Sequence, residues 1–198
     1  MPLILASASP RRSELLQRAG FRFQIVPAAV DELDVGPGSV PGIALRNAER
    51  KADFIAAENP EATVIGADTV VELDGMVLGK PTDPADALRI LMLLSGKRHN
   101  VLTGVCIRNV ARNIRVLFTD RTSVWFRPFD VDTAKRYMSL VNVMDKAGAY
   151  GIQEQGDILV ERIEGLFSNI VGLPVERVAE TLRLIGEVPA ERKEDTND

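Results

Sequence analysis

The sequence predicts a mixed α/β fold with long antiparallel strands at its centre. Short apolar runs alternate with amphipathic helical patterns along much of the chain, an order that is typical of α/β proteins. Two long strand-like runs, residues 99–110 and 114–126, flank Ala111-Arg112-Asn113 and predict a hairpin. Of the 198 residues, 45% are hydrophobic and 26% are charged, so the composition is that of a globular protein long enough to bury a core.

The N-terminal half is expected to begin with a strand, a helix and a second strand, followed by a longer helix. Gly20 follows the first helical pattern, where a glycine commonly ends a helix. The longer helix repeats small apolar residues at helical spacing and stops at Asn59-Pro60. Asp74-Gly75 supplies the positive φ angles that a tight hairpin turn requires. The expected elements are strands at residues 3–6, 21–27 and 63–67, helices at 10–19 and 40–58, and a hairpin turn at 73–76.

The C-terminal half is expected to place helices around the long hairpin. Asp83 is a candidate cap for a helix that ends before Ser95-Gly96. The remaining expected elements are helices at residues 131–140 and 174–185 and a strand at residues 158–163. We expect residues 1–186 to form one domain and the charged residues 187–198 to be a disordered tail.

The junction between the first strand and the first helix has the composition of a phosphate-binding site. Ser9 is the expected N-cap and Pro10 the first helical residue, where a missing N–H group costs nothing. The free N–H groups and the dipole of that helix would then favour an anion beside Ser7, Arg11 and Arg12. An ordinary capped helix whose arginines lie in solvent also explains this local pattern, so the rest of the chain must decide between the two.

Charge and residue usage exclude several classes of protein. The formal net charge of −4 argues against a protein that neutralises many phosphates of a long nucleic acid. No apolar stretch approaches the roughly 20 residues that cross a bilayer and no secretory signal is visible, so we expect a cytoplasmic protein with no membrane contact.

The few reactive side chains narrow the chemistry further. Cys106, the only cysteine, lies in an apolar run and is expected to be buried and inert. His99, the only histidine, rules out a multi-histidine metal site. A Ser-His-Asp arrangement would have to use His99, and no nucleophile-elbow sequence accompanies it. Chemistry would therefore rest on carboxylates, lysine, arginine and a hard metal ion.

Asp68 is the most informative polar residue, because it interrupts an otherwise apolar strand. A carboxylate in such a place is costly unless it is paired or metal-bound, so we interpret it as functional. Glu32 follows the second strand, and Lys51 and Lys80 come before and after Asp68. Taken singly, a solvated helix face explains Lys51, a surface turn explains Lys80, and a helix cap explains Asp145.

Seven short motifs follow one another along the chain. They are Ser7-Ala-Ser-Pro-Arg-Arg12, Asp31-Glu32, Gly66-Ala-Asp-Thr-Val-Val71, Gly79-Lys-Pro81, Ser95-Gly-Lys-Arg-His99 with Thr103-Gly-Val105, Asp145-Lys-Ala-Gly-Ala-Tyr-Gly-Ile-Gln153, and Ser168-Asn-Ile-Val-Gly-Leu-Pro174. In this order they resemble the Maf family of nucleoside triphosphate pyrophosphatases, from about residue 3 to residue 185. The paired Arg11 and Arg12, with Lys80 and Gln153, resemble the branch that acts on dTTP and UTP rather than the branch acting on methylated GTP.

The resemblance implies an activity and an architecture. It implies hydrolysis between the α- and β-phosphates of a nucleoside triphosphate, giving the monophosphate and pyrophosphate. The expected fold is a mixed central sheet flanked by helices, with a cleft between two lobes, similar to the inosine triphosphate pyrophosphatases. The resemblance also implies a homodimer, a small nucleotide substrate and a single Maf-like catalytic domain over residues 1–186.

The resemblance further implies roles for individual residues. Asp68 would orient the attacking water or accept its proton, and Glu32 would share Mg²⁺ or Mn²⁺ with Asp68. Lys80 would act with these two carboxylates, and Gln153 would read the pyrimidine edge. The residues expected to hold the triphosphate are Ser7, Arg11, Arg12, Lys51 and Lys80.

Two segments depart from the family pattern and two other functions stay open. Val141-Asn-Val-Met144 stands where the family commonly has a turn that contains glycine and proline, and Leu166-Phe167 stands where a small residue followed by tyrosine is common. These departures concern the approach to the base pocket more than the phosphate site. The chain could instead be a nucleotide-binding regulator of septum formation, or a phosphate-binding domain of another enzyme class such as a nucleotidyltransferase. Asp68 argues against a pure binder, because an acid that faces a polyanion repels it unless a metal intervenes.

Overall fold

A seven-stranded mixed sheet forms the centre of the protein, in a computed structural model that describes residues 1–33 and 40–189. The strand order is β2-β1-β3-β5-β6-β7, with β4 paired to β3. β1 pairs in parallel with β2 and β3, and the other pairs are antiparallel. The strands are β1 (Leu3–Leu5), β2 (Gln24–Ile25), β3 (Thr63–Leu73), β4 (Met76–Leu78), β5 (Arg98–Asn109), β6 (Ile114–Phe126) and β7 (Val160–Glu164).

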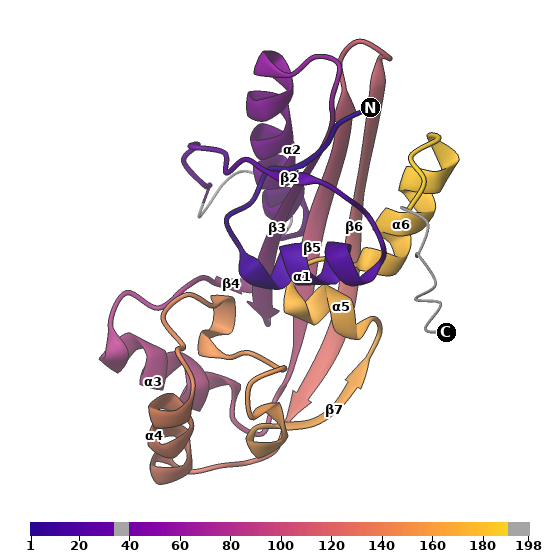
Figure 1. Cartoon of the computed structure of the whole chain (residues 1–198). Helices are drawn as coiled ribbons and strands as arrows, with labels where there is room; N and C mark the ends of the chain where they lie inside the picture. Colours follow the sequence, from indigo (N-terminus) through magenta and orange to yellow (C-terminus); the bar gives the residue numbers. More distant parts are fainter. Residues whose placement is uncertain (34–39, 190–198) are drawn as a thin grey trace, which may run out of the picture.

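Helices cover the two ends of the long strands β3, β5 and β6 separately. The helices are α1 (Pro10–Arg18), α2 (Val40–Glu58), α3 (Pro84–Leu94), α4 (Val131–Leu140), α5 (Phe167–Val171) and α6 (Val175–Leu184), with short 3-10 turns at Ala147–Ala149 and Gly156–Ile158. Figure 1 shows α1, α2 and α6 beside one half of these strands and α3 and α4 beside the other half. We call the half with α1, α2, α5 and α6 the upper lobe, and the half with α3, α4 and residues 141–158 the lower lobe.

Each lobe has its own apolar packing against the shared strands. In the upper lobe, α2 packs on one face of the sheet through Ala48 and Ala52, and α1 and α6 pack on the other face through Leu16 and Leu182. The lower lobe packs α3 and α4 against the other ends of β3, β5 and β6. The sheet is therefore common to both lobes, and the polar residues near the middle of β3 lie at their junction.

Two glycines allow α2 to lie directly on the sheet. A Cβ atom on Gly66 of β3 would lie 2.1 Å from the carbonyl oxygen of Ala48, and one on Gly104 of β5 would lie 2.5 Å from that of Ala44. No side chain fits in these gaps, so glycine is required for this close approach. The approach carries the polar residues of α2 to the carboxylate of Asp68 on β3.

Most expected elements are present, and the turn chemistry is as expected. Asp83 caps α3, its side chain accepting a hydrogen bond from the Asp86 N–H group at 2.8 Å. Asp74 and Gly75 have φ angles of 50° and 84° at the β3–β4 turn. The expected mixed α/β class with a long central hairpin is therefore confirmed.

Two expected strands have other bounds in the structure, and the expected N-cap of α1 is confirmed but makes no side-chain capping bond. The second strand covers only Gln24–Ile25, because Phe21 follows the turn that ends α1, and its N–H group donates to the Leu16 carbonyl of that helix. The last strand begins at Val160, after a 3-10 turn. Ser9 occupies the N-cap position of α1 without a side-chain capping bond, and its own N–H group donates to Ser7 Oγ at 3.2 Å.

The expected disordered tail is only partly within the described residues. Glu187, its first residue, accepts a hydrogen bond from Thr63 Oγ1 at 2.7 Å. Residues 190–198 lie outside the described residues, so the disorder of the tail stays a prediction. Within residues 1–33 and 40–189, no helix combines the length and the apolar character needed to cross a membrane.

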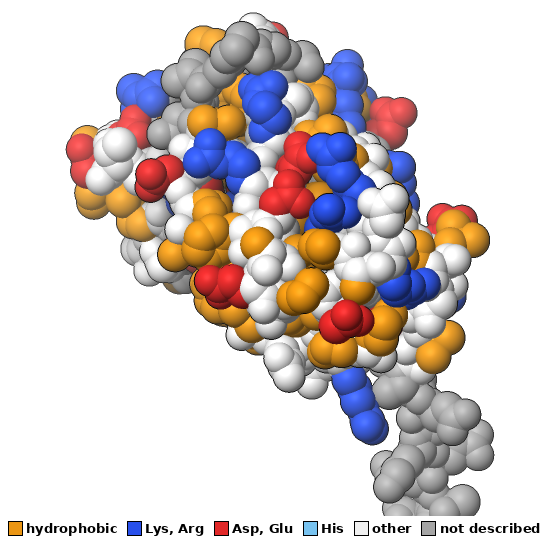
Figure 2. Space-filling model, turned by 90° about the horizontal axis from the view of Figure 1, so that it is seen from above, with side chains coloured by type: hydrophobic (Ala, Val, Ile, Leu, Met, Phe, Trp, Pro, Cys, Tyr) orange, Lys and Arg blue, Asp and Glu red, His pale blue; other side chains and the backbone are white. Residues whose placement is uncertain are grey.

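The surface at the upper-lobe end carries charges of both signs. In Figure 2, which views the molecule from above, acidic and basic side chains are interspersed on the visible face. Some charges in the upper lobe form ion pairs between α2 and the β5–β6 hairpin, such as Arg108 with Asp53 and Arg115 with Glu49.

Candidate active site

A cleft of about 970 Å³ lies between the two lobes. It has an apolar wall that includes Ile43, Val70 and Leu78, and a polar wall formed by charged residues of both lobes. Most candidate residues from the sequence line this cleft, namely Arg11, Arg12, Glu32, Asp68, Lys80 and Gln153. Ser7 and Lys51 lie behind them, each in contact with a lining residue.

Asp68 and Glu32 converge on the ammonium group of Lys51. Lys51 Nζ lies 2.8 Å from Asp68 Oδ1 and 2.7 Å from Glu32 Oε1. Asn47, one turn before Lys51 on α2, donates from Nδ2 to Asp68 Oδ2 at 3.0 Å. Lys51 and Asp68 are 7% and 6% exposed, so the solvated-face explanation of Lys51 is wrong and the acid in the strand is paired.

The electrostatics keep Glu32 ionised beside the cleft. Desolvation by itself would raise the pKa of Glu32, but the hydrogen bond and charge of Lys51 outweigh it, and the pKa is lowered overall. The charges of Lys80 and Arg12 act in the same direction. Two carboxylates, one of them well solvated, are thus available as oxygen ligands at the cleft floor.

The Arg12 guanidinium is held by acceptors from three separate segments. Nε donates to the Gly172 carbonyl at 2.7 Å, Nη1 to Ser7 Oγ at 3.1 Å and Nη2 to Thr69 Oγ1 at 3.1 Å. Burial lowers the pKa of Arg12, while the charges of Asp68 and Glu32 oppose that shift, and a guanidinium stays protonated in any case. The expectation that the arginines of α1 lie in solvent is wrong for Arg12.

Ser7 is a potential donor to an anion. Its Oγ accepts hydrogen bonds from Arg12 Nη1 and from the Ser9 N–H group. A hydroxyl group has one hydrogen to donate and two lone pairs to accept, and both acceptor positions are filled. The Ser7 hydroxyl hydrogen is therefore left for another partner.

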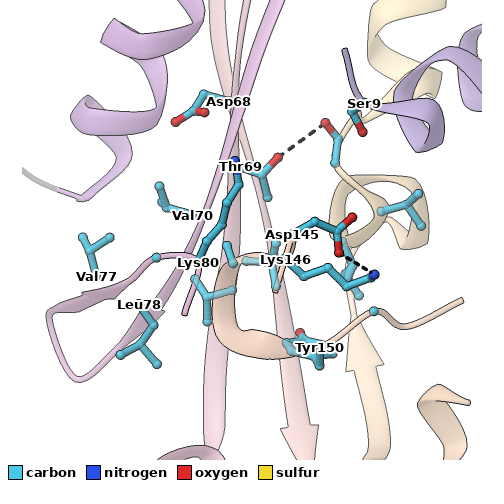
Figure 3. A pocket seen from close by; sticks show the side chains of 18 of the residues that line it. Ser9, Asp68, Thr69, Val70, Val77, Leu78, Lys80, Asp145, Lys146 and Tyr150 are labelled. Atoms are coloured by element: carbon cyan, nitrogen blue, oxygen red, sulfur yellow. Dashed lines mark hydrogen bonds and ion pairs between the residues drawn. The ribbon is translucent and has the colours of Figure 1, made fainter. Parts of the chain in front are cut away.

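Arg11 belongs to a chain of ion pairs that crosses from α1 to the lower lobe. Arg11 Nη1 lies 2.8 Å from Asp145 Oδ2, and Lys146 Nζ lies 2.9 Å from Asp145 Oδ1 and 3.1 Å from Glu154 Oε1. The pair of Asp145 and Lys146 is visible in Figure 3. Desolvation would raise the pKa of Asp145, yet Arg11 and Lys146 lower it overall. An anion that binds Arg11 must compete with Asp145.

Lys80 and Gln153 enter the cleft from the lower lobe. Figure 3 shows the Lys80 side chain extending from the loop after β4 toward Asp68 and Thr69. In the described part of the chain, the Lys80 ammonium has no hydrogen bond or ion pair with another side chain, unlike Lys51. Gln153 is exposed and lines the cleft beside Ile152. Lys80 thus faces the cleft with its donors available.

Sequence reasoning missed Asn47, Thr69 and Lys146 as parts of this site. Asn47 stands four residues before Lys51, and this helical spacing is the signal that could have placed it on the same face of α2. Thr69 follows Asp68, but its contact with Arg12 depends on the packing of α1 against the sheet. Lys146 lies in a segment expected to be a loop, and only the structure shows that it is buried.

The two segments that depart from the family pattern, residues 141–144 and 166–167, are not among the residues that line the cleft. Val141 and Val143 are buried in the lower lobe, and the Leu166 carbonyl accepts a hydrogen bond from Thr122 Oγ1. Asn142 and Phe167 of the same segments are exposed, also outside the cleft lining.

His99 and Cys106 stand outside the cleft lining. His99 Nε2 contacts the Tyr150 hydroxyl at 2.9 Å, so in the described residues its partner is a phenol and not the serine and carboxylate of a triad. Burial lowers the pKa of His99 to about 4. Cys106 is buried, as expected, and burial raises the pKa of its thiol to about 12, so the reactive thiolate is disfavoured.

The fold and the cleft define an α/β protein whose paired carboxylates and fixed cations suit a phosphorylated ligand. Residues 2–185 match the Maf-like protein family, and the chain belongs to that family.

Relatives of similar length support this membership. A dTTP/UTP pyrophosphatase of Akkermansia muciniphila is 43% identical over 187 residues, which cover 93% of this chain and 97% of the relative. Proteins of the same name from Syntrophomonas wolfei and Moorella thermoacetica are each 45% identical, over 88% and 93% of this chain and 92% and 95% of theirs. A solved HAM1 protein from Coxiella burnetii has a TM-score of 0.54 at 15% identity, covering 93% of this chain and 99% of that chain, which shows a shared fold alone.

Proposed function

We propose that this protein hydrolyses dTTP and UTP to the nucleoside monophosphate and pyrophosphate, with residues 1–186 as a single catalytic domain. The observation that carries the proposal is the convergence of Asp68 and Glu32 on Lys51 at the floor of a cleft that Arg12 and Lys80 also line. Cleavage of a phosphoanhydride requires neutralisation of the phosphate charge and an oriented water. The cationic side chains would supply the first and the carboxylates the second. The names of the relatives support the choice of dTTP and UTP.

The roles in this proposal follow from the contacts of each residue. Arg12, Arg11 and Lys80 would neutralise the triphosphate, and Ser7 would donate its free hydroxyl hydrogen to a phosphate oxygen. Asp68 would accept a proton from the attacking water while the oxygen that bridges the α- and β-phosphorus leaves with the pyrophosphate. The carboxylate of Asp68 offers about four lone-pair positions, and the bonds to Lys51 and Asn47 use two.

Base selection is assigned to Gln153 at the rim of the cleft. A carboxamide both donates and accepts, which matches the O4 acceptor and the N3–H donor that thymine and uracil share. Cytosine presents the reversed pattern, an amino donor in place of O4 and an acceptor at N3, which the amide matches when it is turned by 180°. Gln153 would therefore select against cytosine only while its amide is held in one orientation.

A divalent cation fits the oxygen donors of this site. Glu32 and Asp68 already converge on one cationic group, Lys51, so two carboxylates face a common point. Mg²⁺ is commonly bound by one or two carboxylates together with substrate phosphates and water. When bound, the ion would supply charge neutralisation at the phosphates.

A regulator without turnover is less well supported by the same geometry. A binding protein would be weakened by two carboxylates beside a polyanion, whereas a hydrolase uses them. The decisive assay is a panel of nucleoside triphosphates with Mg²⁺, in which pyrophosphate is scored separately from orthophosphate. Release of pyrophosphate from dTTP and UTP supports the proposal. Tight nucleotide binding without any release would favour the regulator.

We also propose a cytoplasmic location and a homodimeric assembly. A cytoplasmic enzyme agrees with the single, buried Cys106, which a reducing compartment leaves as a thiol. The homodimer rests on the family resemblance, and light scattering of the purified protein measures it directly.

A further inference from the structure

Thr103 lies outside the cleft, yet a continuous chain of hydrogen bonds joins it to the guanidinium of Arg12. Thr103 on β5 pairs directly with Thr69 on β3 in the antiparallel ladder, and the two hydroxyl oxygens are 3.0 Å apart. Thr69 Oγ1 accepts the hydrogen bond from Arg12 Nη2. Thr103 itself is fully buried, so any effect on a ligand must be indirect, and Thr69 is its hydrogen-bonded link to Arg12.

Donor counting gives this chain one direction. Thr103 Oγ1 donates to the Asn169 carbonyl at 3.1 Å, which uses its single hydrogen. The Thr69 hydroxyl must then donate, and Thr103 Oγ1 at 3.0 Å is closer than its other acceptor, the Gly172 carbonyl at 3.4 Å. The chain therefore runs from Arg12 through Thr69 and Thr103 to Asn169.

The end of the chain is fixed by the same short segment that holds the other side of Arg12. Asn169, on α5, donates from Nδ2 to the Val101 carbonyl at 3.0 Å and to Thr122 Oγ1 at 3.1 Å. Gly172 ends this helix in the left-handed region, with φ of 119°, and its carbonyl accepts from Arg12 Nε. The guanidinium of Arg12 is thus connected to residues 169–172 in two ways, through Thr69 and Thr103 to Asn169 and directly to the Gly172 carbonyl.

These contacts leave a defined set of donors for the ligand. Arg12 has five N–H groups, of which three are used by Gly172, Ser7 and Thr69. The guanidinium is planar, so fixing three donors fixes the direction of the other two. A wrong orientation would turn those donors away from the cleft that Arg12 lines.

We infer that Thr103 is a positioning residue that orients the Arg12 guanidinium for phosphate binding through Thr69. The inference rests on the proposed function for the role of Arg12 in the reaction. The test measures ligand binding as well as activity. If the proposed activity is absent, the binding measurement still decides the role of Thr103. The probes are inorganic tripolyphosphate, measured by calorimetry, and dTTP with Mg²⁺, measured by pyrophosphate release.

Thr103→Val removes the hydroxyl while keeping the shape of the side chain. It leaves Thr69 with only the longer acceptor, so we expect tripolyphosphate affinity and kcat/KM for dTTP each to fall about five- to tenfold. We expect KM to carry more of this loss than kcat, because the change acts on binding. Thr103→Ser keeps the hydroxyl and should stay within about twofold of the unaltered protein.

Thr122→Val is the matched control. Thr122 is also a fully buried threonine that contacts Asn169, and its hydroxyl donates to the Leu166 carbonyl. It has no bond to Thr69 or Arg12 among those described, so tripolyphosphate affinity should be unchanged even if the protein is less stable. Equal loss of affinity in Thr103→Val and Thr122→Val would overturn the inference and indicate a general packing effect.

A double-mutant cycle with Arg12→Ala isolates the connection. If Thr103 acts through Arg12, Thr103→Val will have little further effect on tripolyphosphate affinity or kcat/KM once Arg12 is absent. Additive losses would contradict the inference. If the unaltered protein binds tripolyphosphate but releases no pyrophosphate from dTTP, the proposed function fails and the binding cycle still decides the role of Thr103. No binding of tripolyphosphate by the unaltered protein would overturn the inference together with the phosphate site.

Discussion

Lys51 Nζ lies 2.8 Å from Asp68 Oδ1 in a contact where both side chains are less than a tenth exposed. The pair joins α2 to β3 at the level where Gly66 and Gly104 bring the helix onto the sheet. Glu32 adds a second carboxylate to the same ammonium group. The site thus has an internal cation between the two acids that are proposed to share a divalent metal.

Replacing Lys51 should destabilise the fold as well as the activity. Lys51→Met leaves Asp68 buried without its cation, and breaking such a pair costs about 3 kcal/mol or more. We expect the free energy of unfolding in urea to fall by that order. The double variant Lys51→Met with Asp68→Asn should recover part of the loss, because the buried position 68 then carries no charge and the remaining carboxylate, Glu32, is partly exposed to solvent. A single variant as stable as the parent would show that the pair contributes no stability.

Asp68→Asn should separate chemistry from binding. The amide cannot accept the proton of the attacking water, and we expect turnover to fall by about 10²- to 10⁴-fold. Lys51 keeps Glu32 as a partner at 2.7 Å, so the fold should hold, and binding of a non-hydrolysable dTTP analogue should persist or tighten. Calorimetry beside a pyrophosphate-release assay measures both effects. Turnover within about tenfold of the parent would remove Asp68 from the mechanism.

Arg12 and Lys80 should differ in their effect on stability. Arg12→Ala removes one hydrogen bond each from the Gly172 carbonyl, Ser7 and Thr69, so both ligand binding and the free energy of unfolding should decrease. The loss of a charged hydrogen bond to phosphate is on the order of 1.5–3 kcal/mol. Lys80→Ala should weaken substrate binding while leaving the urea midpoint nearly unchanged, since no described partner loses a bond. Unaltered kinetics in both variants would contradict the proposed phosphate contacts.

His99 should make the free energy of unfolding depend on pH at values above those at which carboxylates ordinarily titrate. The pKa of His99 is about 4 in the fold against 6.5 in its unperturbed state, so the unfolded chain binds a proton first as the pH falls. The contribution of neutral, buried His99 to the free energy of unfolding is fully present above pH 6.5 and is lost as the pH falls toward 4. The loss amounts to at most about 3 kcal/mol. Urea unfolding between pH 7.5 and 5 measures the slope. His99→Phe should remove most of it, and an unchanged slope would assign the effect to other groups.

Removal of divalent metal should stop turnover without unfolding the protein. Lys51 pairs with the buried carboxylate of Asp68, and the Glu32 side chain is 42% exposed to solvent, so the metal is not needed to compensate buried charge. We expect excess EDTA to abolish pyrophosphate release and to leave the unfolding midpoint unchanged. Full activity in EDTA would exclude a required metal, and restored activity with added Mg²⁺ would complete the test.

Sequence patterns predicted the site more fully than its supporting contacts. Asp68 was identifiable because a carboxylate in an apolar strand is unusual, and the turn at Asp74-Gly75 because its residue types specify its backbone angles. Lys51 was ambiguous, since helical spacing alone does not say whether a lysine faces solvent or a buried acid. The contact of Arg12 with the Gly172 carbonyl joins positions 160 residues apart, and no local pattern encodes such a distance.

The second strand shows the opposite error. Residues 21–27 have strand-like composition, but the Phe21 N–H group donates to the Leu16 carbonyl of α1, and pairing with β1 is confined to Gln24 and Ile25 and one further hydrogen bond, from the Val26 N–H group to the Leu5 carbonyl. Local propensity gave the type of element, while competition for tertiary contacts set its length.

The continuous ladder between β3 and β5 limits how the protein admits its ligand. Nine consecutive residue pairs, from Val64 with Arg108 to Glu72 with Asn100, pass from the upper lobe to the lower lobe. Separating the lobes as rigid bodies would require this ladder to bend or lose hydrogen bonds. The cleft is thus preformed, with its two walls held at a fixed separation by the shared sheet. Entry of a nucleotide requires exchange of side-chain partners rather than a hinge motion between the lobes; on Arg11, for example, a phosphate would replace Asp145.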